Sequence, residues 1–487
     1  MQRFVICLPL IICCVCARLS MGQSGAVEAS STSGPSKQIE PNKTSETKKP
    51  NILFIITDQQ HGSMMSCVGN PHLTTPSMDY LAKEGIRFAN PYVSNPVCVP
   101  SRISMATGVM AGRMGVLNNG MRATIPDYID QHSIGKLLKG AGYDTFYGGK
   151  VHMAPELVPA NAGYDEYFRD EREALPGACI QFIERPRDRP FFAVASFINP
   201  HDICFAYSAY KGQSPRGKSS VEQLYQQAQK MSLDDLPPLP DNYKIPALEP
   251  QALALLANPN AVTPAFLMRQ KYEDRDWRIY RWIYCRLTEQ VDELIGRILD
   301  ALKRNGLDDK TLIVFTSDHG DMDACHRLAS KGIFYDQSVK APLVICYPGH
   351  GVPGQVSEQL VSSGLDVLPT LVDYAGVELP AHVQGKSLRP LLEGKQDTKL
   401  RRYVVTENHT GRMLRTDRFK YCVYRVGTIR ESLVDLQEDP GELVNLATDD
   451  RYQATLNDHR ELLHAWVEET RDDDARTFAF DFQPSAQ

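Results

Sequence analysis

The chain has 487 residues, of which 42% are hydrophobic and 23% charged, and this ordinary balance excludes a globally disordered or fibrous protein. Its net charge at pH 7 is −6, and it contains no lysine/arginine block of the kind that neutralises a phosphate backbone. We therefore expect no nucleic-acid partner. Its length suits two or three domains, and its composition leaves no case for a polytopic membrane protein.

The N-terminus has the pattern of an export signal. Arg3 precedes an apolar run at residues 4–17, and small and polar residues continue to Ala29. The run is too short to span a bilayer comfortably, so we predict a cleaved signal peptide over residues 1–29 and no stable membrane insertion. Four cysteines in this region leave a lipid anchor as an alternative. We expect the mature protein to be secreted or periplasmic.

Residues 30–50 are polar and predict a flexible linker. Eight cysteines lie beyond it and could form four disulfides, but their spacing is irregular and a chain of this length does not need such crosslinks. No C-x-x-C metal motif occurs among them. If one of the eight cysteines is catalytic, an odd number remains, so at least one other thiol stays free.

The folded part begins at residues 51–57 with a continuous apolar run, which is typical of a strand buried in the middle of a sheet. Similar strands and intervening helices are expected at residues 133–139 (helix), 143–147 (strand), 191–197 (strand), 276–304 (a long amphipathic helix) and 311–316 (strand). Strands that alternate with helices indicate an α/β fold, with a mostly parallel sheet covered on both faces.

Polar residues directly follow three of these buried strands. The pairs are Asp58-Gln59, His201-Asp202 and Asp318-His319. An aspartate after a strand is commonly a helix N-cap, which would explain any one of them. The carboxyl ends of parallel strands, however, meet at one edge of a sheet, where ligands collect. Since Ca²⁺ and Mg²⁺ require several oxygen ligands, we predict a divalent-metal site in preference to three separate caps.

Cys98 begins the sequence Cys98-Val99-Pro100-Ser101-Arg102. Pro100 suits the first turn of a helix and Gly108 suits its end, so Cys98 is expected at a helix N-terminus, where free amides favour an anion. A lone cysteine is most often a small buried hydrophobe. Here the pattern Cys-x-Pro-Ser-Arg resembles the signature of the type I sulfatases.

Seven further elements resemble this family in the same order, at residues 51–60, 75–82, 149–152 (G-K-x-H), 199–201, 316–320, 331–336 and 433–446. The resemblance covers nearly the whole chain after residue 50. It implies the alkaline-phosphatase-like α/β fold, a large mixed sheet sandwiched by helices, with a catalytic domain at residues 51–395. A smaller subdomain at residues 396–487 would hold an antiparallel sheet and a packed helix.

The resemblance implies a sulfuric ester hydrolase with six catalytic residues: Cys98, Arg102, Lys150, His152, His201 and Lys331. A formylglycine-generating enzyme would oxidise Cys98 before folding is complete, and one hydroxyl of the hydrated aldehyde would attack sulfur. Arg102, Lys150 and Lys331 would form a cationic cradle for the sulfate. His152 would take the proton of the second hydroxyl. His201, alone or with Lys331, would protonate the leaving alcohol.

The implied metal is Ca²⁺, with Mg²⁺ the less favoured choice, and the implied ligands are Asp58, Gln59, Cys98, Asp318 and His319. Gln59 and His319 depart from the aspartate and asparagine that many members carry, which lowers the negative charge of the site. His319 is therefore also a candidate to contact a ligand or the sulfate instead of the metal. The family carries an arginine at the position of Val109, and Arg113 is the candidate to replace it.

We expect the substrate to be a sulfated carbohydrate, although no motif names a sugar. Three alternatives remain open: a phosphonate monoester or phosphodiester hydrolase of the same superfamily, an aryl or small-molecule sulfatase, and a non-enzymatic carbohydrate-binding relative in which Cys98 is never modified. Ser101, inside the cysteine motif, favours sulfate over phosphate chemistry.

Overall fold

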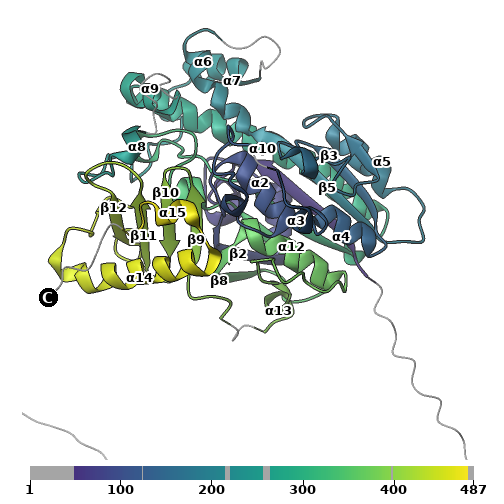
Figure 1. The fold of residues 1–487 in the computed structure, drawn as a ribbon. Coiled ribbons are helices and arrows are strands. Elements are labelled where there is room, and N and C mark those ends of the chain that lie inside the picture. Colours follow the sequence, from purple (N-terminus) through teal and green to yellow (C-terminus); the bar gives the residue numbers. More distant parts are fainter. Residues whose placement is uncertain (1–48, 123, 214–219, 256–263, 396–398, 481–487) are drawn as a thin grey trace, which may run out of the picture. The chain divides into compact units, whose positions relative to one another are not determined.

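The computed structural model describes residues 49–480 with the exception of 123, 214–219, 256–263 and 396–398 (Figure 1). The predicted signal peptide and nearly all of the predicted linker lie outside the described residues. No helix in the described part of the chain is long and apolar enough to cross a membrane.

An eight-stranded mixed sheet forms the core, in the order β4-β3-β5-β1-β6-β7-β2-β8. Within this sheet β7 alone runs opposite to the other strands, pairing antiparallel with β6 and with β2. The strands are β1 (Asn51–Asp58), β2 (Gly85–Tyr92), β3 (Asp144–Gly149), β4 (Glu166–Phe168), β5 (Phe191–Pro200), β6 (Thr311–Ser317), β7 (Leu343–Cys346) and β8 (Gln355–Ser362).

Helices cover both faces of this sheet, because the central strands are apolar on both sides. From β1, Leu53 and Ile55 pack toward α1 (Pro76–Glu84), α5 (Leu175–Ile183) and α10 (Asp274–Arg304). The alternate residues Ile52, Phe54 and Ile56 belong to the opposite core. That core also contains residues of α2 (Cys98–Thr107), α4 (Ile134–Gly140), α12 (Ser363–Tyr374) and α13 (Arg389–Leu392).

A separate four-stranded antiparallel sheet follows near the C-terminus, in the order β12-β11-β10-β9. Helix α14, at the yellow end of the chain in Figure 1, packs on it through Leu463 and Val467, which share a core with Leu414 and Leu433. The elements are β9 (Val404–Asn408), β10 (Gly411–Arg415), β11 (Phe419–Tyr424), β12 (Glu431–Asp435), α14 (Gln453–Thr470) and α15 (Asp473–Arg476).

A further core surrounds the first half of α10, where Trp277 and Tyr284 are buried. The remaining α-helices are α3 (Asp127–Asp130), α6 (Ala206–Tyr210), α7 (Ser220–Gln229), α8 (Ala252–Leu255), α9 (Pro264–Lys271) and α11 (Asp336–Val339). The short 3₁₀ segments are η1 (Ser66–Val68), η2 (Ala111–Met114), η3 (Pro155–Leu157), η4 (His201–Phe205), η5 (Asp308–Lys310), η6 (Cys325–Arg327) and η7 (Asp450–Tyr452).

The predicted fold class is confirmed, and the predicted elements differ from the observed ones by a few residues at their ends. The long helix starts at Asp274, two residues earlier than expected, with a reciprocal cap between Glu273 and Asp276. The packed helix expected in the C-terminal subdomain is α14, which begins at Gln453 directly after the 3₁₀ turn η7. The eight cysteines of the described chain are all free, so none of the four possible disulfides is formed.

Candidate active site

The site lies at the carboxyl ends of the central strands. Strands β1 and β6 are parallel neighbours in which Thr57 pairs with Ser317, so Asp58 and Asp318 leave the sheet side by side. Strand β5 is the other neighbour of β1, and His201 follows its last residue. The sheet order therefore brings together strand ends that are 260 residues apart, as the sequence predicts.

Cys98 is the first residue of α2, and only 1% of it is exposed. Val97 before it is extended, and no side chain caps the helix. Gly108 ends the helix in the left-handed conformation, with φ of 67°, which a residue with a side chain adopts at a cost. The predicted helix is thus confirmed, and its positive N-terminal end faces the strand ends.

Four side chains form a compact buried cluster: Asp58, Cys98, Asp318 and His319. One potential ligand atom from each lies within 4.8 Å of all the others. The Nε2 atom of His319 is 3.1 Å from Cys98 Sγ, 3.5 Å from Asp318 Oδ1 and 3.9 Å from Asp58 Oδ1. The Sγ atom of Cys98 is 4.0 Å from Asp58 Oδ1. These four are all predicted metal ligands.

Arg102, one turn beyond Cys98 on α2, joins the two carboxylates. Its guanidinium donates to Oδ2 of Asp58 at 3.0 Å and to Oδ2 of Asp318 at 2.8 Å. The guanidinium also donates hydrogen bonds to the Ser196 hydroxyl and the Lys150 carbonyl. Because both Oδ2 atoms are engaged, the Oδ1 atoms are the ones near His319 and Cys98. Arg102 is buried beneath the cluster and orients it.

The ring of His319 is held from its other side. Its Nδ1 atom lies 2.9 Å from the Gly320 carbonyl oxygen, a contact that requires the hydrogen on Nδ1. This arrangement leaves Nε2 to face the carboxylates, as in metal-binding histidines fixed by a backbone carbonyl. Burial opposes a positive charge here, but Asp318 raises the pKa of His319 above its usual value, so a metal ion competes with a proton at Nε2.

The two carboxylates strongly perturb each other. Burial, followed by the charge of Asp58, raises the pKa of Asp318 to about 6. Burial would also raise the pKa of Asp58, but the charges of Lys150, Lys331 and Arg102 hold it well below its usual range. A divalent cation would relieve the repulsion between these two carboxylates, and the His319 imidazole and residue 98 provide further ligand atoms beside them. The donor set therefore fits a divalent cation.

Position 98 also favours an anion. Burial and Asp58 would raise the pKa of the Cys98 thiol, but Lys331, His319 and a hydrogen bond with His152 outweigh them and hold it well below its usual value. In this structure residue 98 is an unmodified cysteine, and its Sγ occupies the position of the oxygen-bearing group that the resemblance leads us to expect there. The surroundings thus stabilise a negatively charged group at this position.

Two lysines supply positive charge to the cluster. The ammonium group of Lys150 lies 2.6 Å from Asp58 Oδ2, and that of Lys331 lies 3.3 Å from Cys98 Sγ. Burial would lower the pKa of Lys331, but Cys98, Cys204 and the carboxylates raise it above its usual value. Lys331 therefore stays protonated in the free site.

The two predicted catalytic histidines lie nearer the solvent than the cluster. His152 is exposed and has φ of 43°, a strained conformation for a residue with a side chain. The His201 side chain is 23% exposed, and its Nε2 atom is 4.0 Å from Asp58 Oδ1. Burial, with Lys331 as the next cause, lowers the pKa of His201 to about 3, so this histidine is neutral in the free site.

The side chain of Gln59 is held by Lys331, which the sequence singled out, and by Asp321 and Cys204, to which the sequence assigned no role. Its amide nitrogen donates to Asp321 at 2.7 Å, and its Oε1 atom accepts from Lys331 at 2.6 Å and from Cys204 at 3.1 Å. Its φ is 65°. Tyr280 from α10 also donates to Asp321, at 2.9 Å. The sequence spacing Asp318-x-x-Asp321 places Asp321 near the cluster and could have indicated its role. No sequence pattern marks Tyr280.

Two other residues that the sequence singled out lie outside the cluster. Asp202 follows His201 but pairs with Arg172 at 2.8 Å. Arg113 is exposed on η2, beyond the far end of α2 from Cys98. Its proposed equivalence to a family arginine of the site therefore finds no contact here with the cluster.

Comparisons with known proteins identify the family. The family model "Sulfatase" matches residues 50–377, and "N-sulphoglucosamine sulphohydrolase, C-terminal" matches residues 324–469. A Bacteroides thetaiotaomicron protein named Delta 4,5-hexuronate-2-O-sulfatase is 30% identical over 456 residues, covering 88% of this chain and 90% of its own.

Two solved structures are similar over most of their length. A 2-O glycosaminoglycan sulfatase has a TM-score of 0.75 and 28% identity, with 88% of this chain and 93% of its own covered. A phosphonate monoester hydrolase of Agrobacterium radiobacter has a TM-score of 0.69 and 24% identity, with 86% and 96% covered, and this likeness concerns the fold alone. With its strand-end cluster and the family match over residues 50–377, the chain belongs to the sulfatase family and is a sulfuric ester hydrolase.

Proposed function

We propose that this enzyme removes sulfate from an acidic, glycosaminoglycan-type carbohydrate. The observation that carries the proposal is the buried cluster of Asp58, Cys98, Asp318 and His319, which is enclosed by cationic side chains of the kind a sulfate ester requires. The carbohydrate class rests on the relatives, since a 30% identical protein is named a hexuronate-2-O-sulfatase and a similar structure is a 2-O glycosaminoglycan sulfatase.

Cys98 is the residue that is converted to formylglycine in this proposal. Its burial supports modification before folding is complete, because a modifying enzyme cannot reach a side chain that is 1% exposed. A formylglycine-generating enzyme is therefore the required maturation partner. The hydrated aldehyde would supply one hydroxyl as the nucleophile and a second hydroxyl whose deprotonation releases the bound sulfate, and an ordinary serine lacks that second hydroxyl.

The metal is proposed to be Ca²⁺, with Mg²⁺ second. Asp58, Asp318 and His319 would hold it together with the modified residue 98, and Gln59 Oε1 would be an additional oxygen ligand if it leaves Lys331. Once residue 98 carries oxygen in place of sulfur, most of the donors are oxygens, which suits a hard cation. The cation would lower the pKa of a bound hydroxyl and polarise a sulfate oxygen.

The chain's own residues bind the sulfate and move protons. Lys150 and Lys331 supply the fixed positive charge against which an anionic ester is held, and Arg102 keeps the carboxylates aligned. His152, which helps to lower the pKa of the Cys98 thiol, takes a proton from the modified side chain. Lys331 is protonated in the free site and donates to the leaving oxygen. His201, whose pKa is lowered first by burial and then by the charge of Lys331, joins it once bound sulfate offsets that charge.

The test is a sulfate-release assay on a panel of substrates: a 2-O-sulfated hexuronate disaccharide, a sulfated N-acetylglucosamine, nitrophenyl sulfate and a phosphonate monoester. We expect kcat/KM to be highest on a sulfated sugar, and the Cys98→Ala variant to abolish release. Faster turnover of the phosphonate ester would establish the superfamily alternative, and preference for nitrophenyl sulfate would establish an arylsulfatase.

We also propose that residues 1–29 direct export and are removed, and that residues 30–50 link them to the catalytic domain, residues 51–395. A C-terminal subdomain at residues 396–487 follows the catalytic domain. The apolar run in the first 17 residues supports export to the periplasm or medium. N-terminal sequencing of the protein recovered from the periplasm or medium tests this, and an intact Met1 would contradict it.

A further inference from the structure

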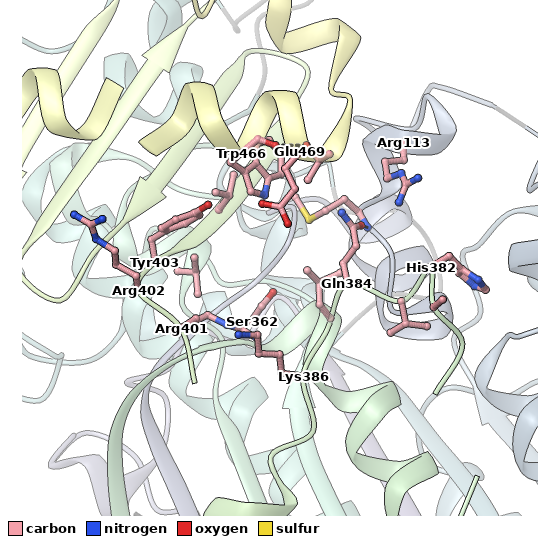
Figure 2. Close-up of a pocket in the computed structure, with 17 residues that line it drawn as sticks. Arg113, Ser362, His382, Gln384, Lys386, Arg401, Arg402, Tyr403, Trp466 and Glu469 are labelled. Atoms are coloured by element: carbon pink, nitrogen blue, oxygen red, sulfur yellow. Dashed lines mark hydrogen bonds between the residues drawn. The ribbon is translucent and has the colours of Figure 1, made fainter. Parts of the chain in front are cut away.

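A second cavity lies apart from the catalytic cluster, with a volume of about 630 Å³. Its walls come from the start of α12, residues 381–386, the segment leading into β9, and the end of α14 (Figure 2). Met110 and Arg113, just beyond α2, form one side. Cys98 is at the opposite end of that ten-residue helix, and a helix rises about 1.5 Å per residue, so the two sites are about 15 Å apart. They share no residue.

The lining of this cavity, which we term the basic cavity, is positively charged. Four cations contribute to it, Arg113, Lys386, Arg401 and Arg402, against one carboxylate, Glu469. Arg401 pairs at 2.6 Å with a buried aspartate outside the lining, so the other three carry the excess. The whole chain has a net charge of −6. A positive cavity on a negative protein concentrates anionic ligands at that place.

The cations at the two ends of the cavity have no partners within the described chain. Arg113 and Arg402 are exposed and form no hydrogen bond or ion pair with a described residue. Figure 2 shows them at opposite ends of the cavity. Arginines placed in this way are available to bind separate sulfate or carboxylate groups of one extended ligand.

Uncharged donors lie between the two arginines. Ser362 is 3% exposed, and its hydroxyl has no hydrogen-bond partner among the described residues. Figure 2 shows Ser362 on the cavity floor. Gln384 accepts from the Met110 amide at 2.7 Å through Oε1, which leaves its amide nitrogen to donate elsewhere. A buried hydroxyl without a partner costs free energy that a bound polar ligand would recover.

Two aromatic side chains complete the cavity, Tyr403 before β9 and Trp466 on α14, and both are half-buried. Their rings offer apolar faces that the C–H face of a pyranose can cover, and each ring has a polar edge. A simple inorganic anion would use neither ring and would fill little of 630 Å³. A nucleic acid would use both, but the negative net charge of the chain opposes a polynucleotide.

We propose that the basic cavity binds an acidic segment of a sulfated glycan, separately from the catalytic site. Sulfate or carboxylate groups pair with Arg113 and Arg402, hydroxyl groups bond Ser362 and Gln384, and sugar rings stack on Tyr403 and Trp466. The cavity thereby holds the polymer while another part of it is at Cys98. The choice of a sulfated glycan rests on the proposed function, whereas the cavity itself does not.

The test measures binding without turnover, on the full chain carrying Cys98→Ala, by titration calorimetry with a heparin octasaccharide. Into this background we place the double substitution Arg113→Ser with Arg402→Ser. The matched control is Arg297→Ser with Arg304→Ser on α10, two exposed arginines that also form no hydrogen bond or ion pair with a described residue. Both pairs change the net charge equally, and both should leave nitrophenyl sulfate turnover unchanged when Cys98 is present.

We expect the cavity pair to weaken octasaccharide binding about tenfold or more, and the α10 pair to leave it unchanged. Equal binding by both variants would overturn the proposal, as would displacement of the octasaccharide by an equal concentration of inorganic sulfate. Tighter binding of single-stranded DNA of similar length would also overturn it. Failure of the proposed function has a different signature, since it is the absence of sulfate release from every sulfated sugar in the panel.

Discussion

Arg102→Lys tests whether the guanidinium orients the metal ligands or only contributes charge. Lysine keeps the positive charge but provides one nitrogen, which cannot bond Asp58 Oδ2, Asp318 Oδ2, Ser196 and the Lys150 carbonyl together. Losing the whole partner of a buried carboxylate costs about 3–5 kcal/mol. Since lysine retains one of the two carboxylate contacts, we expect the free energy of unfolding to fall by about 2 kcal/mol.

The larger consequence is expected in metal binding. With one carboxylate released from Arg102, its oxygens are no longer held toward His319, and disrupting such supporting contacts typically weakens metal binding about 10–100-fold. Calcium titration calorimetry measures this affinity, and urea unfolding in the presence of chelator measures stability separately. Both measurements use the formylglycine-containing protein, with the modification verified by mass spectrometry.

Arg281→Lys is the matched control. Arg281 is also largely buried and pairs with a carboxylate, Asp323, at 3.1 Å, but that carboxylate is outside the metal cluster. This variant should lose stability and keep its calcium affinity. If Arg102→Lys binds calcium as tightly as the parent protein, then Arg102 does not orient the ligands and the reasoning is wrong.

Three further outcomes are expected. Glu407 is buried, and burial raises its pKa from 4.5 to about 7, so the stabilisation present below pH 4.5 is lost as pH rises through 7. Glu407→Gln should therefore gain about 3 kcal/mol over the parent between pH 5 and 8 in urea unfolding, and a constant difference would contradict this. Gln59→Glu sets a carboxylate against Asp321 and should lower the free energy of unfolding by about 1–3 kcal/mol, whereas an unchanged urea midpoint would exclude that contact. Protein made without the modifying enzyme keeps a thiolate at Cys98 and should prefer Zn²⁺ to Ca²⁺ in competition dialysis, with the opposite preference after modification. The same preference in both forms would refute it.

The convergence of Asp58 and Asp318 could be predicted from the sequence, because it depends only on the order and direction of strands. Two buried parallel strands with polar residues after them place those residues at one edge. The position of Cys98 is equally local, since Pro100 and Gly108 set the limits of its helix. These inferences need no knowledge of side-chain conformations.

The contacts of Gln59 could not be predicted in this way. Whether its amide meets the metal, Lys331 or Asp321 depends on rotamers and on a backbone φ of 65°, which neither strand pattern nor helix period encodes. The same is true of Tyr280, whose hydroxyl donates to Asp321. The sequence predicted its helix only as an amphipathic helix that packs on the sheet. Side chains that meet across distant elements require the packed structure.

The central claim is that residue 98 acts as an oxidised cysteine. Mass spectrometry of the peptide that contains this residue, taken from a preparation that releases sulfate, tests the claim most directly. We predict that this peptide has the mass of the aldehyde form. Co-expression of the modifying enzyme should raise the fraction of the peptide in this form, and kcat should rise in proportion to that fraction. A preparation that releases sulfate at full rate with an intact thiol at Cys98 would contradict the account.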